Sequence, residues 1–182
     1  SKVLSRCTSD KWWGCAATRR RRASALLHSF YRDTKHSNMD IRPYQPSDET
    51  AVIALWETCG LTRPWNDPKR DIERKLTEQP ELFLVGVEEG RVMATAMVGF
   101  DGHRGWVYYL AVDPAHQRQS HGKTLMREAE RLLIERGCPK INLLVRTSNQ
   151  QVIEFYRRLG YQQDDAVSLG RRLIPDLPPT ES

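Results

Sequence analysis

Hydrophobic and polar positions recur between residues 40 and 173 with the spacings of strands and helices in turn. The longest apolar run, residues 106–112, reads WVYYLAV and is typical of a strand covered on both faces. Pro114 follows this run, and a proline cannot continue a strand ladder. After a short loop, one helical stripe of apolar residues lies opposite charged ones: Leu125, Met126, Ala129, Leu132 and Leu133. This strand, loop and helix form the centre of the predicted fold.

Other elements are predicted on both sides of this centre. A strand at residues 41–44 comes before two helices, one capped by Ser47 and one spanning residues 68–78. Residues 82–87 and 91–100 read as antiparallel strands that lead into the central strand. A buried strand at 141–145 follows the central helix and is expected to be parallel to the central strand. Ser148 and Gln151 fit a capping box at the start of another helix. A final hairpin at 161–164 and 166–173 completes the pattern.

The resulting order is β-α-α-β-β-β-α-β-α-β-β, which predicts an α/β fold. Its sheet is expected to be mixed, mostly antiparallel and twisted, with helices flanking it. The chain has 182 residues, of which 39% are hydrophobic and 28% charged, and this composition suits one globular domain.

Charge is distributed unevenly along the chain. Residues 1–38 hold nine Lys or Arg and two Asp, a net charge of +7, so the net +5 of the whole chain leaves −2 for the rest. We therefore expect a basic, disordered or non-native N-terminal extension at 1–38, one domain at 39–174 and a proline-rich tail at 175–182. Three interpretations of the extension stay open: Met39 is the natural start, the extension is a basic arm for nucleic acid, or it is an arginine-rich targeting segment.

The four cysteines, Cys7, Cys15, Cys59 and Cys138, form no Cys-x-x-Cys pair and have no histidine nearby at ligand spacing. No zinc or other metal site is therefore expected. Free thiols are typical of a reducing compartment, and no apolar run approaches the length of a membrane span. The sequence thus predicts a cytoplasmic protein without a membrane segment.

The loop between the central strand and helix is a candidate anion site. The first turn of a helix has backbone N–H groups without intrahelical partners and the positive end of the helix dipole. Both attract phosphate, and Arg118 and Lys123 add positive charge nearby. Many helix starts bind nothing, so this geometry alone also fits a solvated turn.

The residues of this loop resemble a known family signature. Residues 110–114, LAVDP, and then Gln117-x-x-Ser120-x-Gly122 are similar to the Val-x-Pro and Arg/Gln-x-x-Gly-x-Gly/Ala pattern of the GNAT-type N-acetyltransferases. Residues 63–68, 99–105, 136–140 and 168–172 look like those of the small bacterial YpeA-type members. Ser120 departs from the pattern, which has glycine there. If φ is positive at this position, the serine costs on the order of 1 kcal/mol; in helical space its hydroxyl could donate to phosphate.

The resemblance implies an enzyme that moves an acetyl group from acetyl-CoA to a primary amine by direct transfer, without a metal. Leu110, Ala111 and Val112 would offer backbone groups to the pantetheine arm. The pyrophosphate would be held by the loop residues Gln117, Arg118, Gln119, Ser120, His121, Gly122 and Lys123. The strand that starts at Ile141 is expected to splay from the central strand, and the thioester would enter this gap.

Two further residues match the family pattern Asn-x6-Tyr-x3-Gly-Tyr. The resemblance implies that Asn149 contacts the cofactor and that Tyr156 protonates the departing thiolate. The residues alone also allow simpler roles, because Asn149 could cap a helix. Tyr156 shares an apolar stripe with Val152 and Phe155, so it could belong to the core.

Acceptor binding is the least specified part of the site. Arg63, Trp65, Asn66 and Asp67 are expected to shape the acceptor mouth, because the first helix pair of the family covers that side. The alternative is structural, with Asp67 as a helix N-cap and Trp65 as a hydrophobic staple. No general base is identified, since the polar residues at strand ends, Glu88, Asp101 and His103, also suit turns.

Two functions of other classes remain as alternatives. The chain could be an acetyl-CoA-binding sensor with little turnover, or a nucleic-acid-binding module that uses its basic N-terminal segment. Nucleic-acid binding is the less favoured of the two alternatives. A homodimer is a possible form of the protein.

Overall fold

The computed structural model describes residues 39–176 of the chain. Predictions for residues 1–38 and 177–182 lie outside the described residues. The elements are, in order, β1 (Asp40–Pro43), α2 (Glu49–Thr58), α3 (Pro68–Thr77), β2 (Phe83–Glu88), β3 (Arg91–Phe100), β4 (Gly105–Val112), α4 (His121–Glu135), β5 (Ile141–Leu143) and α5 (Gln150–Arg158). Short 3-10 turns precede α2, β2 and α4.

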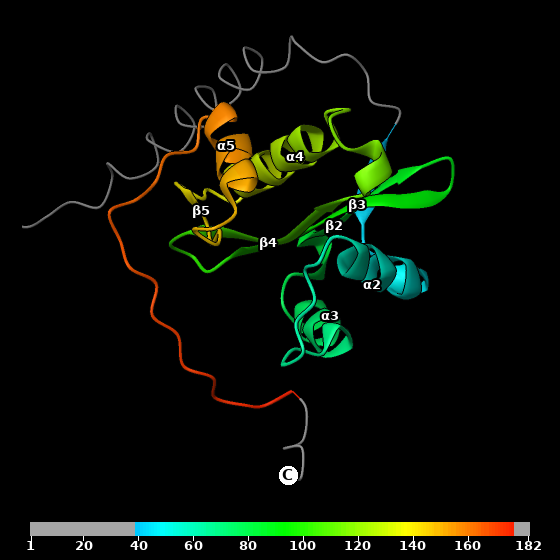
Figure 1. The fold of residues 1–182 in the computed structure, drawn as a ribbon, viewed down its shortest axis with the longest axis horizontal. Coiled ribbons are helices and arrows are strands. Elements are labelled where there is room, and N and C mark those ends of the chain that lie inside the picture. The colour runs from blue at the N-terminus through cyan, green and yellow to red at the C-terminus, as the bar shows by residue number, and fades with distance from the viewer. Residues whose placement is uncertain (1–38, 177–182) are drawn as a thin grey trace, which may run out of the picture. The chain divides into compact units, whose positions relative to one another are not determined.

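The five strands form one sheet in the order β1-β2-β3-β4-β5 (Figure 1). Pairing is antiparallel from β1 to β4, and β5 is parallel to β4 through the α4 crossover. Helices α2 and α3 cover one face, and α4 and α5 cover the other (Figure 1). The predicted fold class, a mixed and mostly antiparallel sheet flanked by helices, is confirmed.

Alternating side chains of the strands build two cores, one on each face. Phe83 and Val85 of β2 pack with Trp56 and Ile72 from α2 and α3, and all four are at most 1% exposed. Leu84 points to the opposite face and packs with residues of α4. This period of two follows from the strand geometry, since successive side chains point to opposite faces.

Two helix starts differ from the prediction by one residue. Ser47 lies within the 3-10 turn Pro46–Asp48, and the N-cap of α2 is Asp48. Asp48 is buried, and its carboxylate is satisfied there by three donors. Two Arg42 nitrogens donate to it at 2.7 and 2.8 Å, and the Gln45 N–H donates at 2.8 Å. At α5 the N-cap is Asn149, not Ser148.

The predicted final hairpin is wrong. Residues 161–164 and 166–173 form no strand, and β5 ends at Leu143. Asp164 is bound by Lys140 at one end, and Asp176 is bound by Arg74 of α3 at the other. Residues 165–175, which we call the arm, are stretched between these two anchors and do not return to the sheet. The strand-like alternation of the arm therefore has no partner strand among residues 39–176.

Within residues 39–176, none of the helices combines the length and the apolar character that crossing a membrane requires. The same residues contain no group of three or more His, Cys, Asp or Glu side chains placed to hold a metal ion.

Candidate active site

A bulge in β4 lies at the centre of the sheet. Thr95 and Met97 of β3 are two residues apart, but their partners in β4, Ala111 and Tyr108, are three apart. The extra residue gives Tyr109 a φ of 49°, in the left-handed region that residues other than glycine rarely adopt. Such strain persists only where the surroundings impose it, and it is concentrated at functional sites.

Three contacts impose this conformation on Tyr109. Its ring stacks on Trp56 with centroids 4.0 Å apart. Its carbonyl oxygen accepts from the Thr95 hydroxyl at 3.0 Å, and the same hydroxyl accepts from the Trp56 indole N–H at 2.8 Å. Its own hydroxyl donates to Asp71 Oδ2 of α3 at 2.6 Å. Burial, with the Asp71 carboxylate beside it, raises the pKa of Tyr109 well above its usual value.

A cavity of about 400 Å³ opens beside this bulge, between α3 and the centre of the sheet. Its wall includes Asn66, Asp71 and Arg74 from the α3 side and Tyr108 and Tyr109 from β4. Since the bulge places two consecutive tyrosines on the same cavity, the wall carries two phenol groups as well as charged side chains.

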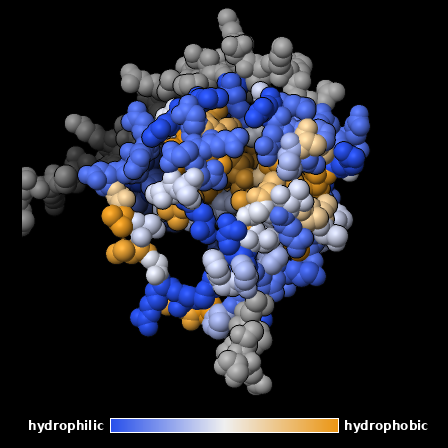
Figure 2. All heavy atoms as spheres, viewed as in Figure 1, coloured by the Kyte–Doolittle hydropathy of each residue, from blue (hydrophilic) through white to orange (hydrophobic). Residues whose placement is uncertain are grey.

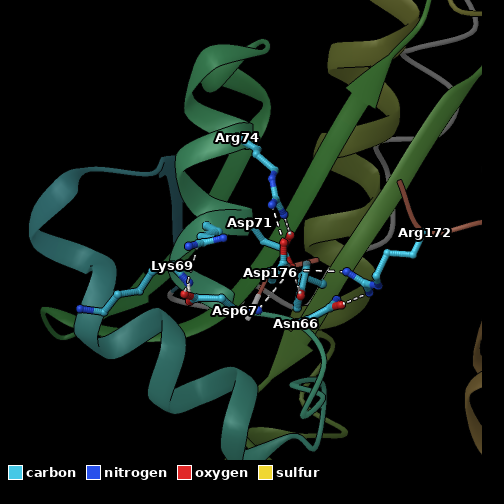
Figure 3. Close-up of polar contacts among 9 residues, drawn as sticks. Asn66, Asp67, Lys69, Asp71, Arg74, Arg172 and Asp176 are labelled. Atoms are coloured by element: carbon cyan, nitrogen blue, oxygen red, sulfur yellow. Dashed lines mark hydrogen bonds and ion pairs between the residues drawn. The ribbon is translucent and has the colours of Figure 1, made fainter. Parts of the chain in front are cut away.

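The cavity is bordered by a chain of polar contacts that ends in the C-terminal segment (Figure 3). Arg74 bridges Asp71, at 3.1 Å, and Asp176, which is only 3% exposed. Asp176 also accepts from the Asp67 N–H at 3.3 Å, and Arg172 donates to Asn66 Oδ1 at 2.6 Å. These contacts fix the orientation of Asp71, which in turn holds the hydroxyl of Tyr109.

The two parallel strands separate at this level. Pairing of β4 with β5 covers Gly105–Ile141, Trp106–Asn142 and Val107–Leu143 and then ends. The strand β4 continues to Val112, so its residues 108–112 have a free edge on the β5 side. The predicted Leu110, Ala111 and Val112 lie along this edge. The expected splay of the strands is therefore present.

Two non-glycine residues have positive φ in the loop after β4. Arg118 has φ 64° and Ser120 has φ 69° with ψ 2°. Turns that contain left-handed residues can point successive N–H groups toward one side, and such a concave stretch of backbone binds anions. Ser120 is the N-cap of α4, but its side chain makes no capping bond. The serine thus has the strain of the left-handed conformation, where the family has a glycine.

The other loop residues differ in exposure. Arg118, Gln119 and Ser120 are exposed, and the side chain of Gln117 donates to the Val112 carbonyl at 3.3 Å. Lys123 is partly buried in the first turn of α4. All of these residues surround the start of one helix, as the sequence predicted.

His121 and Gly122 form the first turn of α4. His121 is 2% exposed, and neither of its ring nitrogens has a hydrogen-bond partner within residues 39–176. A Cβ on Gly122 would lie 3.3 Å from Phe155 Cζ and 3.5 Å from Val112 Cγ2. Only glycine leaves this space open between the end of β4, α4 and α5.

The residues predicted from α5 lie on the same side of the sheet as α4. Asn149 Oδ1 accepts from the Val152 N–H at 3.3 Å, so the side chain of Asn149 caps α5. Tyr156 is 8% exposed and packs edge-to-face with Phe155 and with Tyr161, at 5.1 and 5.6 Å between ring centroids. Burial raises the pKa of Tyr156 to about 12, so its hydroxyl keeps its proton at neutral pH.

The four residues predicted for the acceptor mouth do not lie together on the cavity. Only Asn66 forms part of its wall. Trp65 is 54% exposed, and Arg63 donates to the Thr62 carbonyl. Asp67 accepts from the Lys69 N–H at 2.9 Å and is the N-cap of α3.

The strand-end residues considered as bases have different surroundings. Asp101 accepts from the N–H groups of His103 and Arg104 and from the Trp106 indole. These donors, led by Arg104, lower the pKa of Asp101 to about 2, which makes it a weak base.

Sequence reasoning missed Asp71 and Tyr109, because neither the charged helix nor the apolar strand marks them out.

Comparison with known proteins agrees with this geometry. The model of the acetyltransferase (GNAT) family matches residues 47–161, which run from the turn before α2 to the end of α5. A protein of Yersinia enterocolitica named as an acetyltransferase is 50% identical over 138 residues, 76% of this chain and 98% of that protein.

Two solved structures have the same fold. Ard1 from Thermoplasma volcanium aligns with a TM-score of 0.62 and 27% identity, over 68% of this chain and 82% of that one. AAC(6')-Iy, in complex with the bisubstrate analogue CoA-S-monomethyl-acetylneamine, aligns with a TM-score of 0.64 over 76% of this chain and 100% of that one. Its identity is 16%, so this likeness concerns the fold alone.

Proposed function

The chain belongs to the acetyltransferase (GNAT) family, and we propose that it moves an acetyl group from acetyl-CoA to a primary amine by direct transfer. The observation that carries this proposal is the free edge of β4 next to the anion-binding loop. Residues 108–112 lack a strand partner toward β5, and the first positive-φ residue of the loop, Arg118, follows six residues after Val112. A long molecule with an amide-bearing arm and a phosphate end fits such a combination.

Three features of the loop favour a phosphate-bearing ligand. Gly122 leaves space where a Cβ would contact Phe155. His121 is buried, and within residues 39–176 neither of its ring nitrogens has a partner, whereas buried polar atoms generally have one. Arg118 and Lys123 supply positive charge at the start of α4. We assign the pyrophosphate to this loop and the pantetheine arm to the edge of β4.

Acetyl-CoA supplies the acetyl thioester and, after transfer, a thiolate that needs a proton. Tyr156 is our choice for the proton donor, because its pKa of about 12 keeps it protonated across the neutral range. Asn149 lies about two helix turns before it in the cap of α5 and is assigned to the cofactor. Transfer is direct: the neutral amine nitrogen forms the new bond to the carbonyl carbon and the carbon–sulfur bond breaks. The thiolate takes the proton of Tyr156, the amine releases one proton to water, and water returns a proton to Tyr156.

The amine is placed in the cavity between α3 and β4. Asp71 and the Tyr109 hydroxyl, 2.6 Å apart, lie in its wall and can bind an ammonium group or an N–H. This placement moves the acceptor site from the predicted Arg63, Trp65 and Asp67 toward Asp71 and Tyr109. Asn66 is common to both.

An acceptor panel tests the proposal. Purified protein, acetyl-CoA and a range of amines, amino acids and peptides would be followed by release of CoA thiol and by mass spectrometry of the acceptor. Acetylated acceptor that forms in step with thiol supports the proposal. Thiol release without acetylated product indicates hydrolysis, and tight acetyl-CoA binding without thiol release indicates a sensor; either result contradicts it.

A further inference from the structure

The wall of the cavity between α3 and β4 carries an anionic and a cationic group at different places. Asp71 lies with the Tyr109 hydroxyl at one place, and Arg74 and Lys75 follow in the last turn of α3. Asp71 and Lys75 are four residues apart, so they lie on the same face of the helix, about 6 Å apart along its axis. The cavity can therefore contact two opposite charges of one molecule.

The ammonium group of Lys75 has no carboxylate partner within residues 39–176. Its Nζ donates to the Glu78 carbonyl oxygen at 2.7 Å. The carboxylates of Glu78 and Glu81 are near but outside ion-pair distance. Burial lowers the pKa of Lys75, because the charged form loses part of its hydration. An anion bound beside this ammonium would replace the lost hydration.

Arg74 differs from Lys75 because its position is fixed by the protein. Its two terminal nitrogens bond to Asp71, at 3.1 Å, and to Asp176, which is 97% buried. A guanidinium that is held in this way loses little freedom when a carboxylate binds to its remaining N–H groups. Arg74 thus supplies oriented donors next to the charge of Lys75.

The floor between these groups is largely apolar and open to solvent. Met97 and Gly99 of β3 and Tyr108 of β4 form it, and Tyr108 is 45% exposed. A Cβ on Gly99 would have no atom within 4 Å. None of residues 165–175 lines the cavity, and Figure 2 shows the arm crossing open space beside the body. A small molecule can therefore enter.

We propose that the acceptor is an amino acid, whose amine binds at Asp71 and Tyr109 and whose carboxylate binds in the last turn of α3. There Lys75 supplies the charge and Arg74 the oriented donors. This inference rests on the proposed function for the position of the amine. One hydrogen bond of about 2.8 Å at each end, with the short backbone of an amino acid between them, matches the spacing of the two groups.

Other classes of amine fit this wall less well. A polyamine would bring a second cation next to Lys75, where like charges repel. A lysine side chain of a protein would bring no anion, so Lys75 would stay without a carboxylate. Both charges of an amino acid find a counterpart on the wall.

Calorimetric titrations in the presence of CoA test this assignment without acetyl transfer. The probes are matched sets, each with a free L-amino acid, its carboxamide and the amine that lacks the carboxylate. We expect the amino acid of a set to bind roughly tenfold more tightly than the other two members, as for a hydrogen bond between charged groups. Lys75→Met keeps the stem of the side chain without its charge and should remove this preference.

Two further variants check the position of the site. Lys69→Met is the matched control, since Lys69 lies on the same helix outside the cavity wall and its ammonium pairs with Glu49 at 3.4 Å. It should keep the preference. Gly99→Leu fills the floor at a place where a Cβ meets no other atom, so it should abolish binding of every probe. Circular dichroism and the affinity for CoA should stay unchanged in both variants.

Three results would overturn the amino-acid site: equal binding of amino acids and carboxamides, a preference that survives in Lys75→Met, or no binding of any probe. The acetyl-transfer assay is a separate measurement. Amino acids that bind with a preference dependent on Lys75 but are not acetylated would leave the site standing and contradict the proposed function. Acetylation of amines without this preference would do the reverse.

Discussion

The Tyr109 hydroxyl donates to Asp71 Oδ2 across 2.6 Å, although the two residues are 38 positions apart in the chain. The bond joins the bulge of β4 to α3 and thus crosses the cavity wall. Together with the stacking of the ring on Trp56 and the hydrogen bond from Thr95 to the Tyr109 carbonyl, this bond holds Tyr109 at a positive φ.

Tyr109→Phe tests this bond. The ring can still stack on Trp56, but the hydroxyl is lost and Asp71 keeps only its contact with Arg74. We expect the free energy of unfolding to fall by roughly 1–2 kcal/mol in urea titrations, a value typical of a hydrogen bond to a charged group that is partly solvated. Tyr108→Phe in the same wall is the control and should change it by less than about 0.5 kcal/mol. Equal effects of the two substitutions would argue against a special role for the Asp71 bond.

Tyr156→Phe tests the proton donor. Phenylalanine keeps the edge-to-face packing with Phe155 and Tyr161 but cannot give a proton. We expect kcat to fall roughly 100-fold with an active acceptor, and the affinity for acetyl-CoA measured by calorimetry to change by no more than a few-fold. Equal turnover of wild type and variant across the neutral range would assign the proton to solvent instead.

Ser120→Gly should stabilise the protein, because it removes the Cβ from a residue with φ 69°. The expected gain is roughly 1 kcal/mol, or about 2–4 °C in Tm for a chain of this size. Acetyl-CoA should bind equally or more tightly. Ser120→Ala keeps the Cβ and removes only the hydroxyl, so it should give no gain. A roughly tenfold loss of affinity in both variants would instead show that the serine hydroxyl binds phosphate.

Asp48 should make stability depend on acid pH. The bond from Arg42 and the Gln45 N–H hold the pKa of Asp48 below its usual value. A lowered folded-state pKa adds stability that is fully present above the unfolded pKa of about 4, and that is lost as pH falls through the folded pKa. Asp48→Asn should therefore cost roughly 2–3 kcal/mol at pH 7, since Arg42 is partly exposed, and progressively less in urea titrations below pH 4. A difference between the proteins that stays constant down to pH 2 would contradict this origin.

A chain that starts at Met39 should keep its fold. Met39 is 7% exposed, and its sulfur lies 2.4 Å from where a Cβ on Gly86 would stand, so it belongs to the core that the described residues build. We expect Tm within a few degrees of the full chain, and unchanged affinity for acetyl-CoA, by scanning calorimetry and titration. Met39→Ala in the full chain should cost roughly 2–4 kcal/mol. A large fall in Tm on shortening would instead assign a stabilising role to residues 1–38.

The central strand and helix of the fold are predictable because the apolar residues of each recur with the spacing of that element. The apolar run at residues 106–112 and the helical stripe from Leu125 to Leu133 each bury one defined face, and only a strand and a helix do so with these spacings. The loop between them is marked by its glycine and its positive charges. The position of the loop that we propose as an anion site therefore follows from local sequence.

The cavity does not follow from local sequence. The apolar sequence of β4 is the same whether or not the strand has a bulge at Tyr109. Asp71 lies on the charged helix α3, where a carboxylate is expected to be solvated. The two are brought together only by packing of α3 against the sheet. The prediction of a final hairpin was wrong for a related reason. Val167 and Leu169 alternate with polar residues as in a strand, but a strand forms only where another strand can pair with it.

The spatial order of the strands, β1 to β5, is also their order in time as the chain is made. Strands β2, β3 and β4 are joined by tight turns, so they can zip together as hairpins, which form in about 1–10 μs. The distorted tyrosine of β4 thus belongs to the part of the sheet that consecutive hairpins build. Strand β5, with three residues and a long crossover, joins last. Strand β5 is consequently the last part of the sheet to be synthesised, and the gap beside residues 108–112 of β4 gains its second wall only when the final third of the chain has been made.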